Sequence, residues 1–114
     1  MNVRPLEQLS CAHFAELVNT KFRVWIDVNA QESLEIELTE VTSPRIVVAA
    51  GAKKAAHERF SLHFRGPAER LLPQRVYCFE STALGRFELY ISPAGYDGDA
   101  AYYQATFNRR LTPA

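Results

Sequence analysis

The sequence has no excess of charge of either sign. Its 114 residues carry 13 Lys and Arg against 13 Asp and Glu, so the formal net charge at pH 7 is +0. Long-range attraction to nucleic acid or to an anionic membrane depends on an excess of basic side chains. We therefore expect neither nucleic acid nor a membrane as a partner. Neutral molecules have little electrostatic protection from association, so the composition favours a protein partner and permits a homo-oligomer.

Long apolar runs and cysteines are also scarce. No stretch approaches the roughly 18 apolar residues of a membrane span, and the N-terminal segment MNVRPLEQLSCAHF lacks the basic start and apolar core of a signal peptide. Both observations predict a cytoplasmic chain. Cys11 and Cys78 are too few for a disulfide framework, and neither belongs to a C-x-x-C pair. We expect two buried thiols, because free cysteine usually packs as a small hydrophobic residue.

Motifs for catalysis and metal binding are missing as well. The chain has no G-x-G-x-x-G, P-loop or G-x-S-x-G pattern, and His13, His57 and His63 have no zinc-ligand spacing. The segment YDGD at 96–99 places two carboxylates around a glycine, but no acid follows in 100–108 to complete a calcium loop. Asp-Gly is typical of a tight turn. We therefore predict no catalytic residue, no cofactor and no metal.

Periodicity predicts one helix and about six strands. Ser10 is a favourable N-cap for a short helix that carries Cys11, Phe14, Leu17 and Val18 on one face and ends at Asn19-Thr20. Apolar and polar residues then alternate over 22–29 and 33–40, with NAQE as the hairpin connection, and again over 59–65 until Gly66-Pro67 ends the run. Three more strands are predicted over 75–80, 86–92 and 101–108, joined by the turns STALG and PAGYDGDA.

These elements predict an all-β, or β-dominated α+β, single domain over residues 1–114. Its expected form is about six antiparallel strands in a small barrel or strongly bent sheet, with one short N-terminal helix. A barrel of this size is filled by its own side chains, so we expect no large internal ligand cavity.

Two segments depart from simple alternation. Residues 43–57 contain a Pro, a Gly, paired lysines and only one strand-like fragment, 46–48, which predicts a flexible excursion with too few glycines to cradle phosphate. A third hypothesis is that this segment binds nucleic acid through Lys53 and Lys54. Salt-sensitive retention on heparin would test it. The segment RVYCFE at 75–80 is apolar on both faces, so we expect both faces to be covered, one of them by the helix.

The polar face of the 59–65 strand is the first candidate site. It carries Arg59, Ser61, His63 and Arg65, a pattern compatible with a phosphate-binding stripe or a Ser-His pair. If the 33–40 strand is its hairpin neighbour, Glu35 and Glu37 neutralise it as cross-strand pairs. We favour the neutralised face, because no third residue that orients a base can be assigned. The alternative is a small-molecule binder or hydrolase that uses His63, Arg65 and Arg86.

Surface aromatics form the second candidate site. Trp25, Tyr90 and Tyr102 lie on the polar side of their strands, and exposed Trp and Tyr are common anchors of protein interfaces. The predicted interaction surface therefore comprises Trp25, Tyr90, Tyr102, Arg65 and His63. The competing interpretation is that the helix or the 43–57 excursion covers Trp25.

Spaced landmarks run through most of the chain. They are Phe60-Ser61-Leu62-x-Phe64-Arg65-Gly66-Pro67, then Leu72-Pro73-Gln74-x-x-Tyr77, Leu84-Gly85, Pro93 and Tyr103-x-Ala105-x-Phe107-Asn108. This pattern resembles a family of small bacterial proteins known only as a domain of unknown function, with the excursion around Ile46–Ala56 as a departure. The resemblance implies no catalytic residue, and it implies that the genes of the family neighbour those of phage-tail-collar or tail-fibre-like proteins. We therefore expect a non-enzymatic interaction or assembly module, as an accessory to a phage-tail-like or fibre assembly.

Overall fold

The computed structural model describes residues 3–5, 8–27, 29, 31–48 and 56–111, which form one helix and seven strands. In chain order the elements are α1 (Cys11–Ala15), β1 (Lys21–Asp27), β2 (Glu32–Val41), β3 (Arg45–Val48), β4 (Ala56–Pro67), β5 (Arg75–Ser81), β6 (Gly85–Tyr96) and β7 (Ala100–Leu111).

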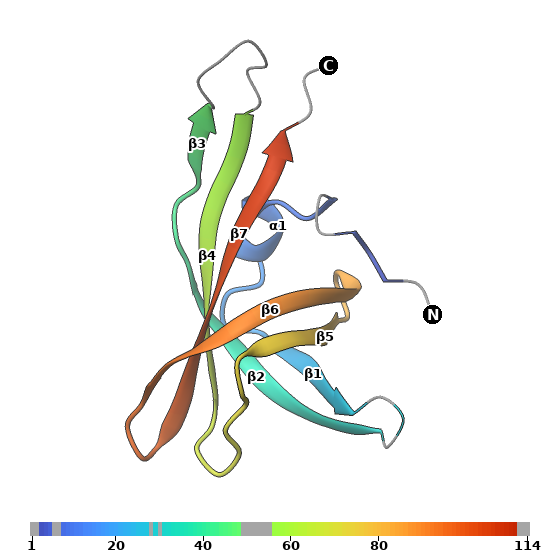
Figure 1. The fold of residues 1–114 in the computed structure, drawn as a ribbon, viewed down its shortest axis with the longest axis vertical. Coiled ribbons are helices and arrows are strands. Elements are labelled where there is room, and N and C mark those ends of the chain that lie inside the picture. Colours follow the sequence, from blue (N-terminus) through green and yellow to red (C-terminus); the bar gives the residue numbers. More distant parts are fainter. Residues whose placement is uncertain (1–2, 6–7, 28, 30, 49–55, 112–114) are drawn as a thin grey trace.

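The strands form a closed antiparallel barrel. The order is β2-β1-β5-β6-β7-β4, and an additional pairing between β2 and β4 joins the two ends, so six strands of the described chain close the barrel. The β2–β4 pairing closes the six-strand sheet on itself, whereas β3 pairs on one side only, with β4. The predicted β-dominated barrel with one short N-terminal helix is confirmed. Figure 1 shows that β3, β4 and β7 continue upward past the other strands.

Strand β4 changes its neighbour along its length. Its first residues pair with β3, where Arg45 is the Cα partner of Arg59, and its last residues pair with β2, where Leu38 is the partner of Phe64. The predicted excursion at 43–57 therefore contains strand β3 and the start of β4. Residues 49–55, including the two lysines, lie outside the described residues.

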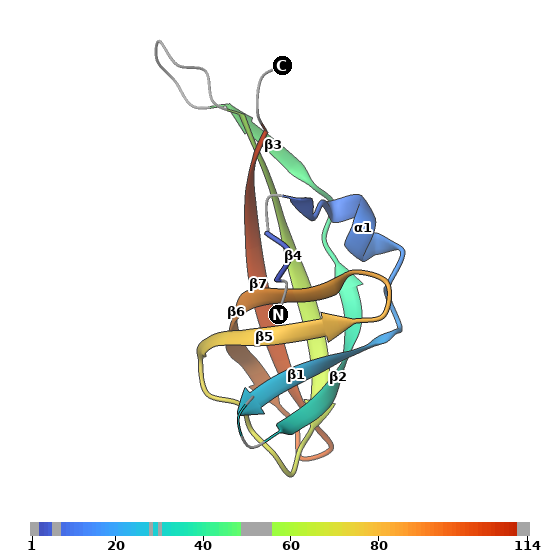
Figure 2. The ribbon, with the colours of Figure 1, turned by 90° about the vertical axis from the view of Figure 1, so that its right-hand side faces the viewer.

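The helix covers one end of the barrel (Figure 2). The Ser10 hydroxyl accepts a hydrogen bond from the His13 amide at 3.4 Å, as a helix N-cap does. The helix ends at Ala15, earlier than the periodicity predicts, although Leu17 and Val18 still pack against the core. The Phe14 ring is fully buried, and its centroid lies 5.2–6.4 Å from four other aromatic rings, those of Phe22, Phe60, Phe87 and Phe107.

Strand β4 does not stop at Arg65 as predicted. Gly66 pairs with Ala101 and Pro67 with Ala100, so the strand ends at Pro67 itself. Gly66 is required by packing: a Cβ atom there would lie 2.8 Å from Ile36 Cγ2. Strand β6 likewise runs further than predicted, to Tyr96, through an irregularity between Pro93 and Gly95.

Strand β5 is covered on one face only. Tyr77 and Phe79 are buried in the barrel, whereas Val76 on the opposite face is 52% exposed and Cys78 is half-buried. The prediction that both faces are covered was therefore wrong, and α1 lies over the end of the barrel instead. No helix in the described part of the chain is long and apolar enough to cross a membrane.

Candidate functional site

The outer face of β4 carries the polar stripe that the sequence predicts. Arg59, Ser61, His63 and Arg65 alternate with core residues, and each faces a polar or aromatic partner on β7. The partners on the other side of β4 differ from one end of the strand to the other, because β2 flanks one part and β3 flanks the rest. The stripe therefore divides into two regions.

The region around Arg65 is balanced in charge, as predicted. Glu37 is the Cα partner of Arg65, and His63 Nε2 lies 3.8 Å from Glu40 Oε1. Glu35 is instead opposite Arg23 on β1. A surface cavity of about 310 Å³ lies here, and we call it the mixed-charge cavity. It is lined by Lys21, Glu35, Glu37, Arg65, Gly66, Pro67, Asp99 and Ala100.

Neither cross-strand partner of Arg59 in the described part of the chain is acidic. Its Cα partner is Arg45 on β3, so two cations face each other across the strand pair. A cavity of about 330 Å³ opens beside them, and we call it the arginine cavity. It is lined by Thr42, Ser43, Arg45, Arg59, Phe60, Ser61 and Thr106.

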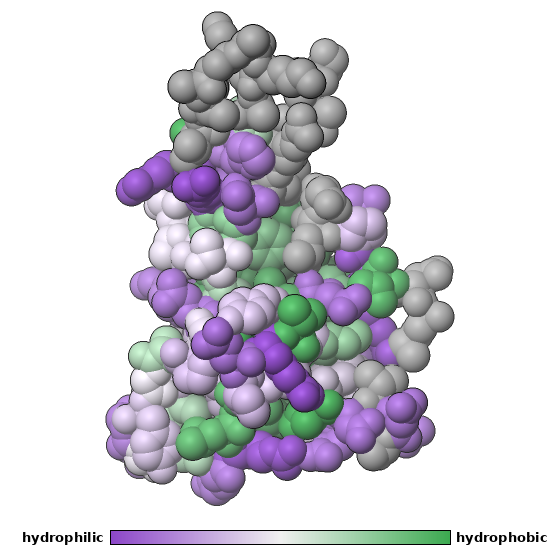
Figure 3. Space-filling model, viewed as in Figure 1, coloured by the Kyte–Doolittle hydropathy of each residue, from purple (hydrophilic) through white to green (hydrophobic). Residues whose placement is uncertain are grey.

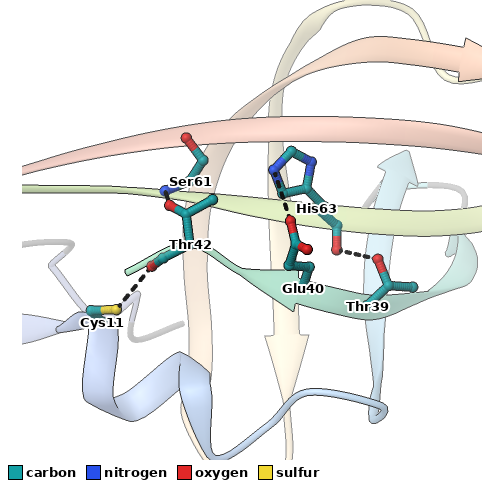
Figure 4. A network of polar contacts seen from close by, with 6 residues as sticks. All are labelled: Cys11, Thr39, Glu40, Thr42, Ser61 and His63. Carbon is teal, nitrogen blue, oxygen red and sulfur yellow. Dashed lines mark hydrogen bonds and ion pairs between the residues drawn. The ribbon is translucent and has the colours of Figure 1, made fainter. Parts of the chain in front are cut away.

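Hydrogen bonds join β4 to the end of β2 at the boundary between these two regions (Figure 4). The Ser61 amide donates to Thr42 Oγ1 at 2.8 Å, and the Thr42 amide donates to the Ser61 carbonyl at 3.0 Å. Thr39 Oγ1 donates to the His63 carbonyl at 3.1 Å. On the side of α1, the Cys11 thiol donates to the Thr42 carbonyl at 3.5 Å. The polar network thus connects α1, β2 and β4.

Neither thiol has the environment of a catalytic nucleophile. Burial, aided by the Glu58 carboxylate, raises the pKa of Cys11. Burial also raises the pKa of Cys78, against the opposing effect of the Arg86 guanidinium. Both cysteines are free, with Cys11 buried and Cys78 half-buried. Because the thiolate is the reactive form, both positions are poorly suited to nucleophilic chemistry at neutral pH.

The predicted turn at YDGD is formed by Asp97. Its Oδ1 atom accepts hydrogen bonds from the amides of Asp99 and Ala100, each at 2.9 Å, and its Oδ2 atom accepts one from the Tyr102 hydroxyl at 2.7 Å. The Tyr102 bond, then the two amide bonds, lower the pKa of the Asp97 carboxyl. Within the described residues, no group of three or more His, Cys, Asp or Glu side chains is placed to hold a metal ion.

Trp25 is half-buried, and the described contacts of its ring come from the barrel strands β1, β5 and β6. The guanidinium carbons of Arg23 and Arg86 lie 5.7 and 5.3 Å from its ring centroid, and its Nε1 donates to Glu80 Oε1 at 3.0 Å. Such cation–π contacts and a hydrogen bond satisfy the ring on the surface of the barrel. Glu80 also pairs with Arg86 at 3.3 Å.

The five residues of the predicted interaction surface do not form one patch. Tyr102 is the Cα partner of Arg65, and His63 follows on the same face of β4. Trp25 lies on β1, and Tyr90, 48% exposed, lies on β6 opposite Val76. Of the three residues of the small-molecule or hydrolase alternative, only Arg65 lines the mixed-charge cavity, and His63 and Arg86 do not.

Sequence reasoning missed an apolar cavity at the end of the barrel away from α1. It measures about 260 Å³ and is lined by Leu71, Leu72, Pro93, Gly95, Tyr96, Ala101, Tyr102 and Tyr103. Leu71 is 58% and Tyr96 60% exposed at its rim. Figure 3 shows hydrophobic surface near this end of the molecule beside hydrophilic surface. The available signal was Leu71, an apolar residue between charged and proline residues in a predicted connection.

Comparison with known proteins gives a family and no activity. No curated protein and no solved structure matches the chain significantly. The family described as Domain of unknown function (DUF6916) matches residues 9–107, a range that includes α1, β1 to β6, β7 as far as Phe107, and all the landmarks quoted above except Asn108. The chain therefore belongs to this family, Domain of unknown function (DUF6916).

Proposed function

We propose that the protein is a non-enzymatic interaction module that binds a partner protein through the apolar cavity. The observation that carries the proposal is the lining of this cavity, where every residue is apolar, aromatic or glycine and where Leu71 and Tyr96 are exposed at the rim. Exposed apolar surface gathered around a hollow is typical of a binding site.

The size and chemistry of the cavity favour a protein over a small molecule. Its volume of about 260 Å³ is below the roughly 300–1,000 Å³ of small-molecule sites, and no charged side chain lines it to orient a metabolite. A cavity of this kind accepts an aliphatic or aromatic side chain from a partner. Tyr96 and Tyr102 supply the large, partly polar rings that anchor protein interfaces.

The cavity wall is fixed before any partner binds. The hydroxyl of Tyr102 is held by Asp97, and the hydroxyl of the buried Tyr103 accepts a hydrogen bond from the Leu72 amide at 2.9 Å. A wall that is already ordered loses little side-chain entropy on association. An accessory role beside a phage-tail-like or fibre assembly, which the sequence resemblance implies, is the specific form of this proposal.

A matched pair of variants tests the proposal. The native protein is purified from its own cells, its partner is identified by mass spectrometry, and the complex is then reconstituted from pure components. Leu71→Asp should abolish the complex, because it places a charge at the apolar rim. Val76→Asp, at a similarly exposed apolar position on β5, should leave the complex intact.

Thermal unfolding of both variants serves as the folding control. Equal loss of the complex in Leu71→Asp and Val76→Asp would contradict a role for the apolar cavity. Recovery of the native protein only as a free monomer, or only as an oligomer of itself by light scattering, would contradict a separate protein partner.

A further inference from the structure

The arginine cavity contains two cations and no acid. Arg45 and Arg59 are directly opposed Cα partners, and both line the hollow. In the described part of the chain neither guanidinium takes part in an ion pair or a hydrogen bond. Like charges directly opposed on neighbouring strands destabilise a sheet. A bound anion would turn this repulsion into attraction.

Hydroxyl groups complete the lining. Thr42, Ser43, Ser61 and Thr106 surround the two arginines. Since Thr42 Oγ1 already accepts the Ser61 amide, its own hydroxyl hydrogen remains available to a ligand. The hydroxyls of Ser61 and Thr106 lie on directly paired residues of β4 and β7. The cavity thus combines guanidinium and hydroxyl donors around one hollow.

The site is held by backbone pairing on both sides. Reciprocal hydrogen bonds join Thr42 and Ser61, and β4 pairs with β7 through residues on either side of Ser61. Beneath the strands, the Phe60 and Phe107 rings stack with centroids 4.9 Å apart. Donors carried by such a fixed frame need little rearrangement to bind a ligand.

We propose that the arginine cavity binds the phosphate group of a small phosphorylated molecule. A guanidinium presents a planar fork of donors that matches phosphate oxygens in a bidentate manner, and hydroxyls serve the remaining oxygens. Two arginines balance the double negative charge of a phosphate monoester. The volume of about 330 Å³ lies within the range of small-molecule sites and leaves room for part of the organic moiety.

A small molecule fits better than a nucleic-acid backbone. Binding along a strand of phosphates needs a continuous basic track. The stripe on β4 instead meets acidic side chains a few residues further on, where Glu40 lies beside His63 and Glu37 is opposite Arg65. The basic surface next to the cavity is interrupted on that side.

Isothermal titration of the full chain with sodium pyrophosphate and with inorganic phosphate, at constant ionic strength set by sodium chloride, tests the site. We expect saturable binding of one pyrophosphate per chain. Arg45→Gln and Arg59→Gln should each weaken it at least about tenfold, because each removes a charge-assisted contact. Arg59→Lys should weaken binding less than Arg59→Gln, since the charge remains while the bidentate fork is lost.

Arg65→Gln is the matched control, because it removes an exposed arginine from the same strand face outside the cavity. It should leave binding unchanged, and amide resonances of Ser61 and Thr106 should shift when pyrophosphate is added to the wild type. The proposal is overturned by the absence of saturable binding up to about 10 mM, or by equal weakening in Arg65→Gln. Tighter, steeply salt-dependent binding of a single-stranded oligonucleotide than of pyrophosphate would also overturn it and indicate a nucleic-acid site.

Discussion

Two cavities of similar volume lie on the outer face of one strand, yet they differ in charge. The mixed-charge cavity, about 310 Å³, combines two cations with three acids, whereas the arginine cavity, about 330 Å³, has two cations and no acid. Arg65 is opposed by Glu37, and Arg59 is opposed by Arg45. Strand β4 supplies arginine to both, so the difference arises from its neighbours.

A molecule of zero net charge can therefore still carry a local electropositive site. The net charge of +0 excludes a long-range field but says nothing about how charges are distributed. In this barrel β2 places its glutamates beside the C-terminal part of β4, and the short strand β3 places Arg45 beside the N-terminal part. The change of partner strand therefore separates a balanced surface from a binding surface.

Removal of the Phe14 ring should have the largest effect on stability, because it takes away the aromatic packing that supports Phe60 at the arginine cavity. Phe14 lies beneath Phe60, which lines the arginine cavity, and contacts three further rings. Phe14→Ala should lower the free energy of unfolding by about 3–5 kcal/mol, through lost burial and a residual void. Urea denaturation measures the change, and Val76→Ala at an exposed position is the control. A loss below about 1 kcal/mol would show that the barrel does not depend on its helical cover.

Gly66→Ala should have the next largest effect, and it acts on the mixed-charge cavity. The added Cβ would lie 2.8 Å from Ile36 Cγ2 and 3.4 Å from Tyr103 Cε2, so the core must shift. Overpacking of this kind costs about 1–3 kcal/mol. Gly95→Ala is the matched control, because its Cβ would meet Tyr102 Cδ2 at an ordinary 3.7 Å. Equal thermal stability of the two variants would contradict the packing requirement at Gly66.

Gly66 also shows where sequence reasoning succeeds and where it fails. Alternation predicted the strands and the core residues Phe60, Leu62 and Phe64, because burial on one face imposes a period of two. It placed the end of the strand two residues too early, because Gly-Pro is a general stop signal and the pairing with Ala100 and Ala101 depends on tertiary contacts.

The candidate sites were predictable only in part. The neutralised half of the stripe follows from hairpin pairing, which places Glu37 opposite Arg65. The pairing of Arg45 with Arg59 could not be predicted from the sequence, because residues 45–48 form a strand too short to show a clear alternation. The apolar cavity joins the β4–β5 connection to β6 and β7, and no local periodicity reports such a long-range junction.

Removing one arginine charge from each of the two cavities should change stability less, and with opposite signs. Arg59→Gln should raise the free energy of unfolding by at most about 1 kcal/mol, since it relieves repulsion from Arg45 at an exposed site. Arg65→Gln should lower it by a similar or smaller amount, since the attraction to Glu37 is lost at an exposed site. Chemical denaturation with urea at low ionic strength measures both. Added sodium chloride should reduce both differences, and changes of the same sign in the two variants would refute the division of the stripe.

The smallest expected effect concerns Asp97, beside the mixed-charge cavity. The Tyr102 hydroxyl is the main cause of its lowered pKa, followed by the amides of Ala100 and Asp99, with a minor contribution from Arg65. A carboxyl with a lowered pKa in the folded state stabilises the fold above its unfolded pKa, and this stabilisation is lost as the pH falls through the folded pKa.

Tyr102→Phe should therefore raise the pKa of Asp97 toward the ordinary 3.8 and narrow the acidic pH range over which Asp97 contributes to stability. Because the two amide bonds remain, the pKa should stay below that ordinary value. Titration of the Asp97 carboxyl carbon by NMR measures the shift, with Tyr96→Phe as the control. An unchanged pKa in Tyr102→Phe would mean that the backbone of the turn alone keeps Asp97 ionised. In that case the geometry of the β6–β7 turn would not depend on Tyr102, the residue that is opposite Arg65 and also lines the apolar cavity.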